Sequence, residues 1–255
     1  MSSAALDHSS VAIDAGPVGV LLSHGFTGSP VSMRPWALEL AARGHSVRVP
    51  LLPGHGTTWQ EMNTTTWNDW YGAVDAALTE LEERCEHVVV AGLSMGGALA
   101  LRLAEKRPDV VDGLVLVNPA IASRDKRLLA LPVLHRVVAS LDAIGNDIKK
   151  PGVEEGAYPR TPLRALHSQT VMWKDVRANL DAVRCPVLLL RSDDDHVVDD
   201  ETQRLLRAAL PAEQLETVAL HDSYHVATLD HDAPLIVERS LAFIDRVTGG
   251  VDRAR

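Results

Sequence analysis

The sequence predicts an α/β fold in which a mostly parallel central sheet carries helices on both faces. Short apolar runs recur along the chain, and most are nearly continuous in apolar character, as strands buried on both faces should be. Segments with helical periodicity lie between these runs, and this alternation indicates parallel strands joined by helices. The expected strands are 18–22, 47–49, 88–91, 114–117, 187–190 and 215–220.

Two helices are indicated by the spacing of their apolar residues. From Trp67 to Leu81 these residues lie on one face of a helix. The aromatic members could form a base-stacking platform, but this spacing is more typical of core packing, which we favour. Near the C-terminal end, Asp232 and Pro234 suit the start of a final helix.

Length and composition fit one large domain spanning residues 1–255, with a full hydrophobic core. The net charge of −9 argues against nucleic acid or an anionic membrane as the main partner. No apolar run approaches the roughly 20 residues of a membrane span. The N-terminal residues lack the basic start and apolar core of a signal peptide, so we expect a cytoplasmic protein. We accordingly expect its two cysteines, Cys85 and Cys185, to be free thiols.

The alternation of strands and helices is interrupted between Val117 and Val187, where no convincing strand is found. Residues 128–145 are amphipathic and predict a helix, whereas residues 149–162 are rich in turn-forming residues. An interval of this length is uncommon as a plain connection. We therefore interpret 120–167 as a cap, or lid, inserted over the carboxyl ends of the strands.

A serine lies where the strand 88–91 must turn sharply into a helix. The motif "GLSMG" over 92–96 has this strand–turn–helix context, which makes Ser94 a candidate nucleophile. The glycines two residues before and after the serine leave room for a strained turn, where a Cβ atom would clash. The serine hydroxyl would project at the N-terminus of the helix, whose free amides favour developing negative charge.

A nucleophilic serine needs a base and an acid that orients the base. "SDDDHVVDD" supplies acids just beyond the strand 187–190, and of Asp193, Asp194 and Asp195 we choose Asp195, because the two valines at 197–198 can anchor its loop. The later pair at 199–200 is expected to cap the next helix. A calcium site is the alternative for this acidic run, but the glycine and distant glutamate of a calcium loop are missing.

The base is expected in "LHDSYHVATLDHD", which follows the strand 215–220. His221 and His225 lie four residues apart, but in a loop this spacing does not indicate a metal pair. We choose His225, which lies deeper in the loop and precedes a small, apolar stretch; His221 is nearer the strand end, and His231 precedes the final helix.

An oxyanion hole would complete such a site. One donor is the backbone N–H of Met95, directly after the nucleophile, and the other is expected from Phe26 in the loop "SHGFTGSP". His24, beside the glycine of this loop, is interpreted as a brace rather than as a base.

The motifs "HGFTG", "GLSMGG", "SDDDHVV" and "SYHVATLDHDAPLIVERSL" resemble those of the α/β-hydrolase superfamily over nearly the whole chain. The chain is most similar to bacterial monoacylglycerol lipases and related carboxylesterases. The resemblance implies Ser94 as nucleophile, Asp195 as acid and His225 as base. It also implies that the amides of Phe26 and Met95 form the oxyanion hole.

The same resemblance implies that 120–167 is a lid over an acyl tunnel. It further implies that Glu155, in "VEEGAY", contacts the glycerol hydroxyls of a substrate. From the residues alone, Glu155 would instead be a solvated turn residue.

Together these features predict a serine esterase that cleaves monoacylglycerols, or similar acyl esters, through an acyl-enzyme intermediate. No cofactor and no metal are expected, and the partner is a small-molecule acyl ester, with transient lipid contact through the cap but no stable membrane insertion. Two alternatives stay open: a broad carboxylesterase or thioesterase without glycerol preference, and a non-catalytic receptor for a small apolar ligand. Haloalkane dehalogenases and epoxide hydrolases are excluded, because they place an aspartate where Ser94 stands.

Overall fold

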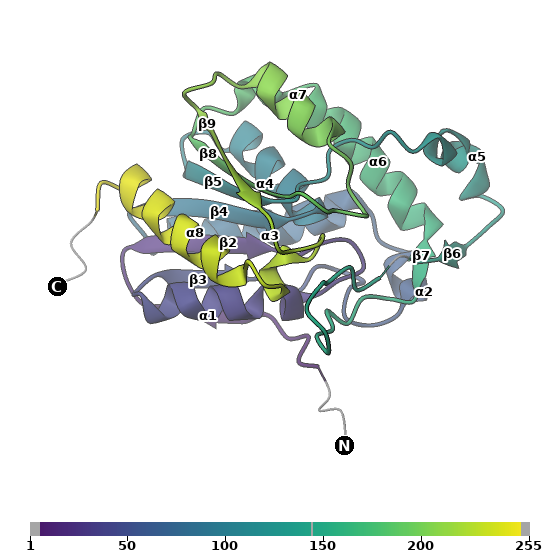
Figure 1. The fold of residues 1–255 in the computed structure, drawn as a ribbon, viewed down its shortest axis with the longest axis horizontal. Helices are drawn as coiled ribbons and strands as arrows, with labels where there is room; N and C mark the ends of the chain where they lie inside the picture. The colour runs from purple at the N-terminus through teal and green to yellow at the C-terminus, as the bar shows by residue number, and fades with distance from the viewer. Residues whose placement is uncertain (1–5, 144, 251–255) are drawn as a thin grey trace.

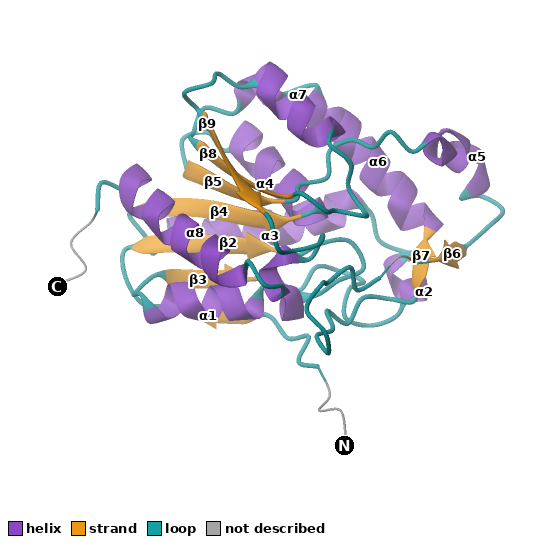
Figure 2. Ribbon diagram, viewed as in Figure 1, coloured by secondary structure: helices purple, strands orange, loops and turns teal. Residues whose placement is uncertain are grey.

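The computed structural model describes residues 6–143 and 145–250, which contain a seven-stranded central sheet. Its strands lie in the order β1-β3-β2-β4-β5-β8-β9 (Figures 1 and 2). β1 is antiparallel to β3, and the other neighbouring pairs are parallel. The bounds are Val11–Ile13 for β1, Val18–Ser23 for β2, Ser46–Val49 for β3, His87–Leu93 for β4, Val111–Val117 for β5, Val187–Ser192 for β8 and Leu215–Leu220 for β9.

The sheet confirms the predicted α/β architecture, and each of the six expected strands is present. β1 was not expected from the sequence. It has only three residues, and of these only Val11 is buried, so its apolar pattern is too short to recognise. It extends the sheet by pairing with the edge of β3.

Successive residues of the central strands pack on opposite faces of the sheet. In β4, Val88 and Val90 belong to one apolar cluster, whereas Val89 and Ala91 belong to the other. Helices α3, α4, α6 and α7 contribute to the first cluster, and α1 and α8 to the second (Figure 1). Their bounds are Arg34–Ala42 for α1, Trp67–Glu82 for α3, Met95–Lys106 for α4, Leu163–Arg177 for α6, Glu201–Ala209 for α7 and Ala233–Val247 for α8.

Helix α3 confirms the core interpretation of its aromatic residues. Trp70, Val74 and Leu78 are fully buried against the sheet. The helix begins where the backbone N–H of Thr66 donates to the Asp69 carboxylate at 2.7 Å, which supplies a partner at the helix start. The predicted final helix is α8, with Asp232 at its N-cap and a proline in its first turn.

The interval between β5 and α6 differs from the prediction. Residues 128–145 do not form one helix; a 3₁₀ turn (Lys126–Ala130) leads into α5 (Leu131–Leu134), and a short strand β6 (Ser140–Asp142) follows. β6 pairs antiparallel with β7 (Arg160–Pro162), so the interval does contain strands.

The physical reason lies in the residues of the segment itself. Pro132 suits the first turn of α5, and Ser140 is buried against Arg160, whose Nε donates to the Ser140 hydroxyl at 2.7 Å. Residue 167, where the cap was expected to end, lies inside α6, which continues into the core through Met172 and Val176.

The remaining short elements are 3₁₀ turns at Pro30–Ser32, Leu180–Ala182 and Ala227–Leu229 and the single-turn helix α2 (Trp59–Met62). Within the described ranges, no helix has both the length and the apolar character needed to cross a bilayer. Cys85 and Cys185 are both free thiols.

Candidate active site

The turn between β4 and α4 places Ser94 in a conformation that few residues adopt. Its φ is 56° and its ψ is −117°, in a region unfavourable for a side chain with a Cβ atom. The neighbouring glycines are required by contact. A Cβ atom built on Gly96 would lie 2.0 Å from the carbonyl oxygen of Ser23, and one on Gly92 would lie 2.3 Å from the carbonyl carbon of Gly96. The predicted strand–turn–helix context of the serine is therefore confirmed.

Hydrogen bonds from the next strand hold this turn in place. The Ser94 N–H donates to the carbonyl of Val117, at the end of β5, at 3.0 Å. The Ser94 carbonyl accepts from Ala120 N and from Gly97 N, each at 3.0 Å. The serine is largely buried, and the α4 N-terminus begins at the following residue.

Asp195 and His225 form a buried hydrogen-bonded pair. His225 Nδ1 lies 2.9 Å from Asp195 Oδ2, and the side chains are only 8% and 0% exposed. Asp195 Oδ1 accepts from the amides of Val197 at 2.9 Å and Val198 at 2.8 Å. The valine pair thus anchors the acid through its backbone, as the sequence suggested.

The charges around Asp195 keep it ionised. Burial alone would raise the pKa of this carboxyl, but the His225 ring, the Arg191 guanidinium and the Val198 amide lower the pKa to about 2. An ionised carboxylate can only accept hydrogen bonds, so the His225 Nδ1 carries the proton of the pair. The other ring nitrogen, Nε2, is then left as the basic atom.

Two residues that sequence reasoning missed complete the surroundings of this pair. Arg191, at the end of β8, donates to Asp195 Oδ2 and to the carbonyl of Val198. Asn118 directly follows β5 and donates through Nδ2 to the carbonyl of His225 at 2.8 Å. A polar residue immediately after a buried strand was the available signal for Asn118.

Asn118 also links the loop of the histidine to the strand end that holds the serine turn. Its amide group joins the His225 loop to the end of β5, and the preceding carbonyl, that of Val117, accepts the Ser94 N–H. The hydrogen bonds among the described residues do not include a direct one between Ser94 Oγ and the His225 ring. The two are instead brought to the same edge of the sheet by backbone and Asn118 contacts.

The alternative acid and base residues form a separate pair at the surface. His221 Nδ1 lies 2.6 Å from Asp193 Oδ2, with side chains 78% and 57% exposed. Asp199 accepts from the Glu201 N–H at 2.9 Å, at the start of α7, as expected of a capping residue. Asp200 occupies the N-cap position, but its side chain makes no capping hydrogen bond.

The loop after β2 lies beside Ser94. A Cβ atom built on Gly25 would lie 3.4 Å from the Ser94 Cβ. No hydrogen bond among the described residues uses the backbone N–H of Phe26 or of Met95.

His24 braces this loop, in agreement with its interpretation from the sequence. Its Nε2 accepts from the Leu52 N–H at 3.2 Å, so the proton is on Nδ1, which lies 3.0 Å from the Gly25 carbonyl. Burial lowers the pKa of His24 to about 4, which keeps the ring neutral.

Glu155 lies close to the same loop. Its Oε2 would be 3.6 Å from a Cβ atom built on Gly28. Glu155 Oε1 accepts from the Asn146 N–H at 3.1 Å, and the Glu155 N–H donates to Asn146 Oδ1 at 2.9 Å. Burial raises the pKa of Glu155, although the Asn146 amide and the charge of His225 act in the opposite direction.

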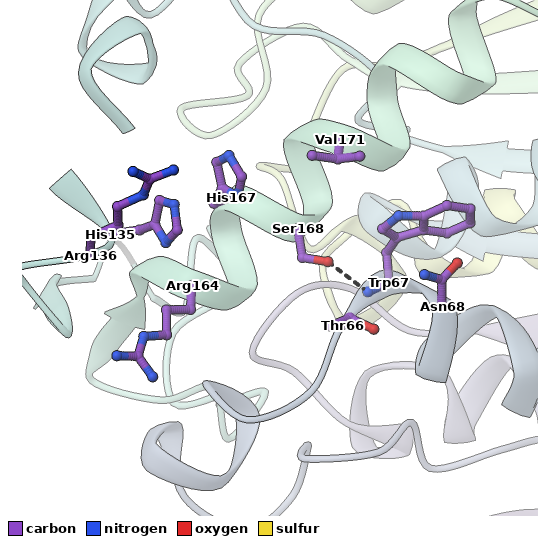
Figure 3. Close-up of a pocket in the computed structure, with 9 residues that line it drawn as sticks. All are labelled: Thr66, Trp67, Asn68, His135, Arg136, Arg164, His167, Ser168 and Val171. Atoms are coloured by element: carbon purple, nitrogen blue, oxygen red, sulfur yellow. Dashed lines mark hydrogen bonds between the residues drawn. The ribbon is translucent and has the colours of Figure 1, made fainter. Parts of the chain in front are cut away.

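A surface hollow of about 510 Å³ lies elsewhere, between the start of α3, α6 and residues 135–136 (Figure 3). The rings of His135 and His167 stack there at 4.1 Å. The hollow is lined by neither the serine nor the acid–base pair, so it is not the candidate active site. Its lining residues are Thr66, Trp67, Asn68, His135, Arg136, Arg164, His167, Ser168 and Val171.

Comparison with known proteins identifies the family of the chain. The model of the family described as serine aminopeptidase, S33, matches residues 18–232. The chain belongs to this family. The chain is also similar to the thermostable monoacylglycerol lipase of Bacillus sp. (strain H-257), to which it is 44% identical over 92% of this chain and 93% of that protein.

Solved structures place this S33 family chain in the α/β-hydrolase fold. One, from work on the metagenome-derived lipolytic enzymes LipS and LipT, has a TM-score of 0.90 and 42% identity, over 94% of this chain and 98% of that chain. The monoacylglycerol lipase of Paleococcus ferrophilus has a TM-score of 0.77 at 20% identity, over 94% and 98%, and supports the fold alone.

Proposed function

We propose that this protein is a serine ester hydrolase that cleaves monoacylglycerols to glycerol and a fatty acid. The observation that carries the proposal is the buried Asp195–His225 hydrogen bond at the same sheet edge as Ser94 in its strained turn. The 44% identity to a monoacylglycerol lipase over nearly the full length of both chains supports the substrate class.

In the proposed first step, His225 Nε2 takes the proton of the Ser94 hydroxyl as Oγ attacks the ester carbonyl. The C=O π electrons move to oxygen, and the amides of Phe26 and Met95 stabilise the resulting oxyanion. The imidazolium then gives its proton to the glycerol oxygen as the C–O bond breaks. Asp195 stays ionised throughout and stabilises the charged ring.

In the second step, water takes the place of the departed glycerol. His225 removes a proton from the water, which attacks the acyl-enzyme carbonyl and forms a second oxyanion. Collapse of this intermediate returns the proton to Ser94 Oγ and releases the fatty acid. The two steps together consume one water per ester, and no other reactant is required.

We further propose that 120–167 acts as a cap over the acyl chain and that Glu155 accepts hydrogen bonds from the glycerol hydroxyls. The position of Glu155 near the loop 25–28 supports this role, because that loop flanks Ser94. The exposed apolar side chains of Leu129, Val133 and Val137 support transient contact of the cap with lipid.

A second candidate is a broad carboxylesterase without a glycerol preference. It is favoured by the similarity to a carboxylesterase of Bacillus subtilis (strain 168), which is 25% identical over 91% of this chain and 94% of its own length. The chemical steps at Ser94 would be the same, and only the contribution of Glu155 would differ.

Labelling and substrate profiling test these proposals. A fluorophosphonate should label Ser94 in the wild-type protein and should not label Ser94→Ala. The profile compares a monoacylglycerol, a triacylglycerol, p-nitrophenyl butyrate and an aminoacyl p-nitroanilide. Preference for the monoacylglycerol supports the first proposal, and equal rates on the two lipids would refute an enclosed acyl site. Absence of labelling would refute the serine mechanism itself.

A further inference from the structure

Asp147, between β6 and β7, joins the two loops that carry the proposed acid and base. Its Oδ2 accepts from the backbone N–H of His225 at 3.1 Å and from that of His196 at 3.2 Å. Its Oδ1 lies 2.8 Å from the ring Nδ1 of His196. One carboxylate thus contacts the base residue itself and the residue directly after Asp195.

The backbone of Asp147 adds a third connection. Its carbonyl accepts from the Val226 N–H at 3.1 Å. The backbone amides of His225 and Val226 therefore both donate to Asp147. The Asp147 side chain is only 12% exposed, which protects these hydrogen bonds from competing water. Side chain and backbone together restrict where the His225 backbone can lie relative to the Asp195 loop.

The residue before Asp147 makes a matching set of contacts to Glu155. Asn146 exchanges two hydrogen bonds with Glu155 and donates through Nδ2 to the carbonyl of Val153 at 3.0 Å. Its φ of 59° is a left-handed conformation that asparagine tolerates better than most residues. Two consecutive residues therefore hold Glu155 on one side and His225 on the other.

A second buried aspartate fastens the rest of this segment. Asp230 accepts from the amides of Lys149 at 2.6 Å and Lys150 at 2.9 Å, and also from that of Tyr224 at 3.0 Å. The segment 146–150 is consequently attached to the base loop at several points, and Asp147 supplies the hydrogen bond to His225 itself.

We propose that Asp147 is a positioning residue that sets the distance between His225 and Asp195, and that the pair Asn146–Asp147 fixes Glu155 relative to the base. This inference rests on the proposed function. The physical reason is that the hydrogen bond to Asp195 orients the His225 ring toward the nucleophile. Proton transfer requires hydrogen-bond distance between base and nucleophile, and a displacement of about 1 Å can cost about 100-fold in rate. Asp147 acts through its position, and its charge is secondary.

Three substitutions of Asp147 separate the effect of the position of its side chain from the effect of its charge. Asp147→Ala removes the acceptors. Asp147→Asn keeps the shape of the side chain. Its Oδ1 can accept from both backbone amides, and its Nδ2 can donate to His196 Nδ1 when the ring proton is on Nε2. Asp147→Glu keeps the charge but moves the carboxylate by one methylene. We expect kcat for p-nitrophenyl butyrate to fall about 10- to 100-fold in the alanine and glutamate variants, with KM little changed and the asparagine variant close to wild type.

Asp193→Ala is the matched control, since it removes an aspartate from a histidine pair on the same acid loop without touching His225. We expect its kcat to stay within about twofold of wild type, because exposed ion pairs contribute little. Circular dichroism checks the fold of every variant. If Asp147→Ala does not fold, Asp147→Glu and Asp147→Asn still give opposite expectations.

The outcomes separate this inference from the proposed function. A wild-type protein that a fluorophosphonate does not label would overturn both. A labelled wild type with Asp147→Glu at wild-type kcat, or with Asp147→Asn as impaired as Asp147→Glu, would overturn the positioning role alone. An equal loss in Asp193→Ala would also overturn it, because the effect would then belong to the acid loop as a whole.

Discussion

Ser94 combines an unfavourable backbone conformation with close packing that prevents it from relaxing. Its φ of 56° and ψ of −117° cost on the order of 1–3 kcal/mol for a residue with a side chain. The contact between Gly96 and the Ser23 carbonyl, and the hydrogen bond from Ser94 N to Val117, keep the turn in place. The packing and hydrogen bonds of the turn therefore fix the backbone of Ser94 without any bound substrate.

Removal of the serine or the histidine should each abolish turnover. We expect Ser94→Ala and His225→Ala to lower kcat/KM for p-nitrophenyl butyrate by about 10⁴-fold or more, and the double variant to lose little beyond either single one. The reason is that nucleophile and base act as one unit. His221→Ala, whose ring pairs with Asp193 at the surface, is the control. An inactive His221 variant beside an active His225 variant would reverse our choice of base.

Substitution of Glu155 should affect only substrates that carry free hydroxyls. Hydrogen bonds to a charged group contribute about 1.5–3 kcal/mol, so Glu155→Leu should lower kcat/KM for monoacylglycerol by about 10- to 100-fold. Hydrolysis of p-nitrophenyl butyrate should hardly change. Parallel losses on both esters would point to damage of the fold, and unchanged rates on both would favour the broad carboxylesterase.

The preference for monoacylglycerol should also depend on pH. The pKa of Glu155 is raised, chiefly by burial, so its carboxylate loses its charge at a higher pH than an ordinary glutamate does. As pH falls through that value, hydrogen bonding to glycerol weakens, and the ratio of kcat/KM for monoacylglycerol to that for p-nitrophenyl butyrate should fall. Taking the ratio cancels pH effects on the chemical steps at Ser94, which both substrates share. A ratio that stays constant in Glu155→Leu but falls in the wild type identifies the titrating group.

At the scale of elements, two glycines in neighbouring helices differ in what surrounds them. Gly97 in α4 faces Pro119, and a Cβ atom built on it would lie 2.7 Å from the Pro119 Cβ. Gly72 in α3 has no atom within 4 Å of such a Cβ. The first glycine permits close packing of α4 beside the serine turn, whereas the second has only the flexibility of an exposed helical residue.

These two glycines should respond oppositely to the same substitution. Gly72→Ala should raise the free energy of unfolding by about 0.5–1 kcal/mol, because alanine loses less backbone entropy in a helix. Gly97→Ala should lower it by about 1–3 kcal/mol through overpacking against Pro119. Urea unfolding followed by circular dichroism measures both. A stabilised Gly97 variant would mean that α4 can move away from the loop at no cost.

Most elements could be predicted because each leaves its own signal in the sequence. The buried strands, the α3 face and the α8 start follow from local patterns, and the "GLSMG" turn follows from its flanking strand and helix. The predicted helix over 128–145 was wrong because an amphipathic pattern does not show that Ser140 pairs with Pro162.

The contacts that hold the site could not be predicted in the same way. Asp147 reaches His225 across 78 positions in the sequence, and no motif around Asp147 marks that contact. Nothing in the sequence distinguishes Arg191 from the other residues of β8, although its guanidinium contacts Asp195. The proposed acid and base can be identified from motifs. The residues that hold them in place, such as Asp147, are found only when the contacts between loops distant in the sequence are known.

At the scale of the whole molecule, the candidate site is assembled from loops at the carboxyl ends of five parallel strands. Phe26 follows β2, Ser94 follows β4, Asn118 follows β5, Asp195 follows β8 and His225 follows β9. Neighbouring strands in the sheet order β2-β4-β5-β8-β9 therefore each contribute one part. The proposed acid, base and nucleophile thus come from three different segments, although Asp195 also accepts hydrogen bonds from Val197 and Val198 of its own loop.

Activity should for this reason be lost together with the fold. We expect the urea midpoint for hydrolysis of p-nitrophenyl butyrate to coincide with that for far-ultraviolet circular dichroism, as in a two-state transition. Activity that disappears at clearly lower urea, while the dichroism is unchanged, would show that the loops open locally before the sheet does.

The position of β9 at the far end of the sheet has a consequence for the synthesis of the protein. Ser94 leaves the ribosome 131 residues before His225 (225 − 94). The strand that leads to the histidine can add to the sheet only after β8 is in place, since β9 pairs with β8 at the end of the strand order over the described residues. Under the proposed mechanism, a growing chain thus exposes its serine without a base to activate it. Ester cleavage therefore requires the chain to be synthesised at least as far as His225 and β9 to be paired with β8, so a nascent polypeptide that stops short of this point has no activity on esters.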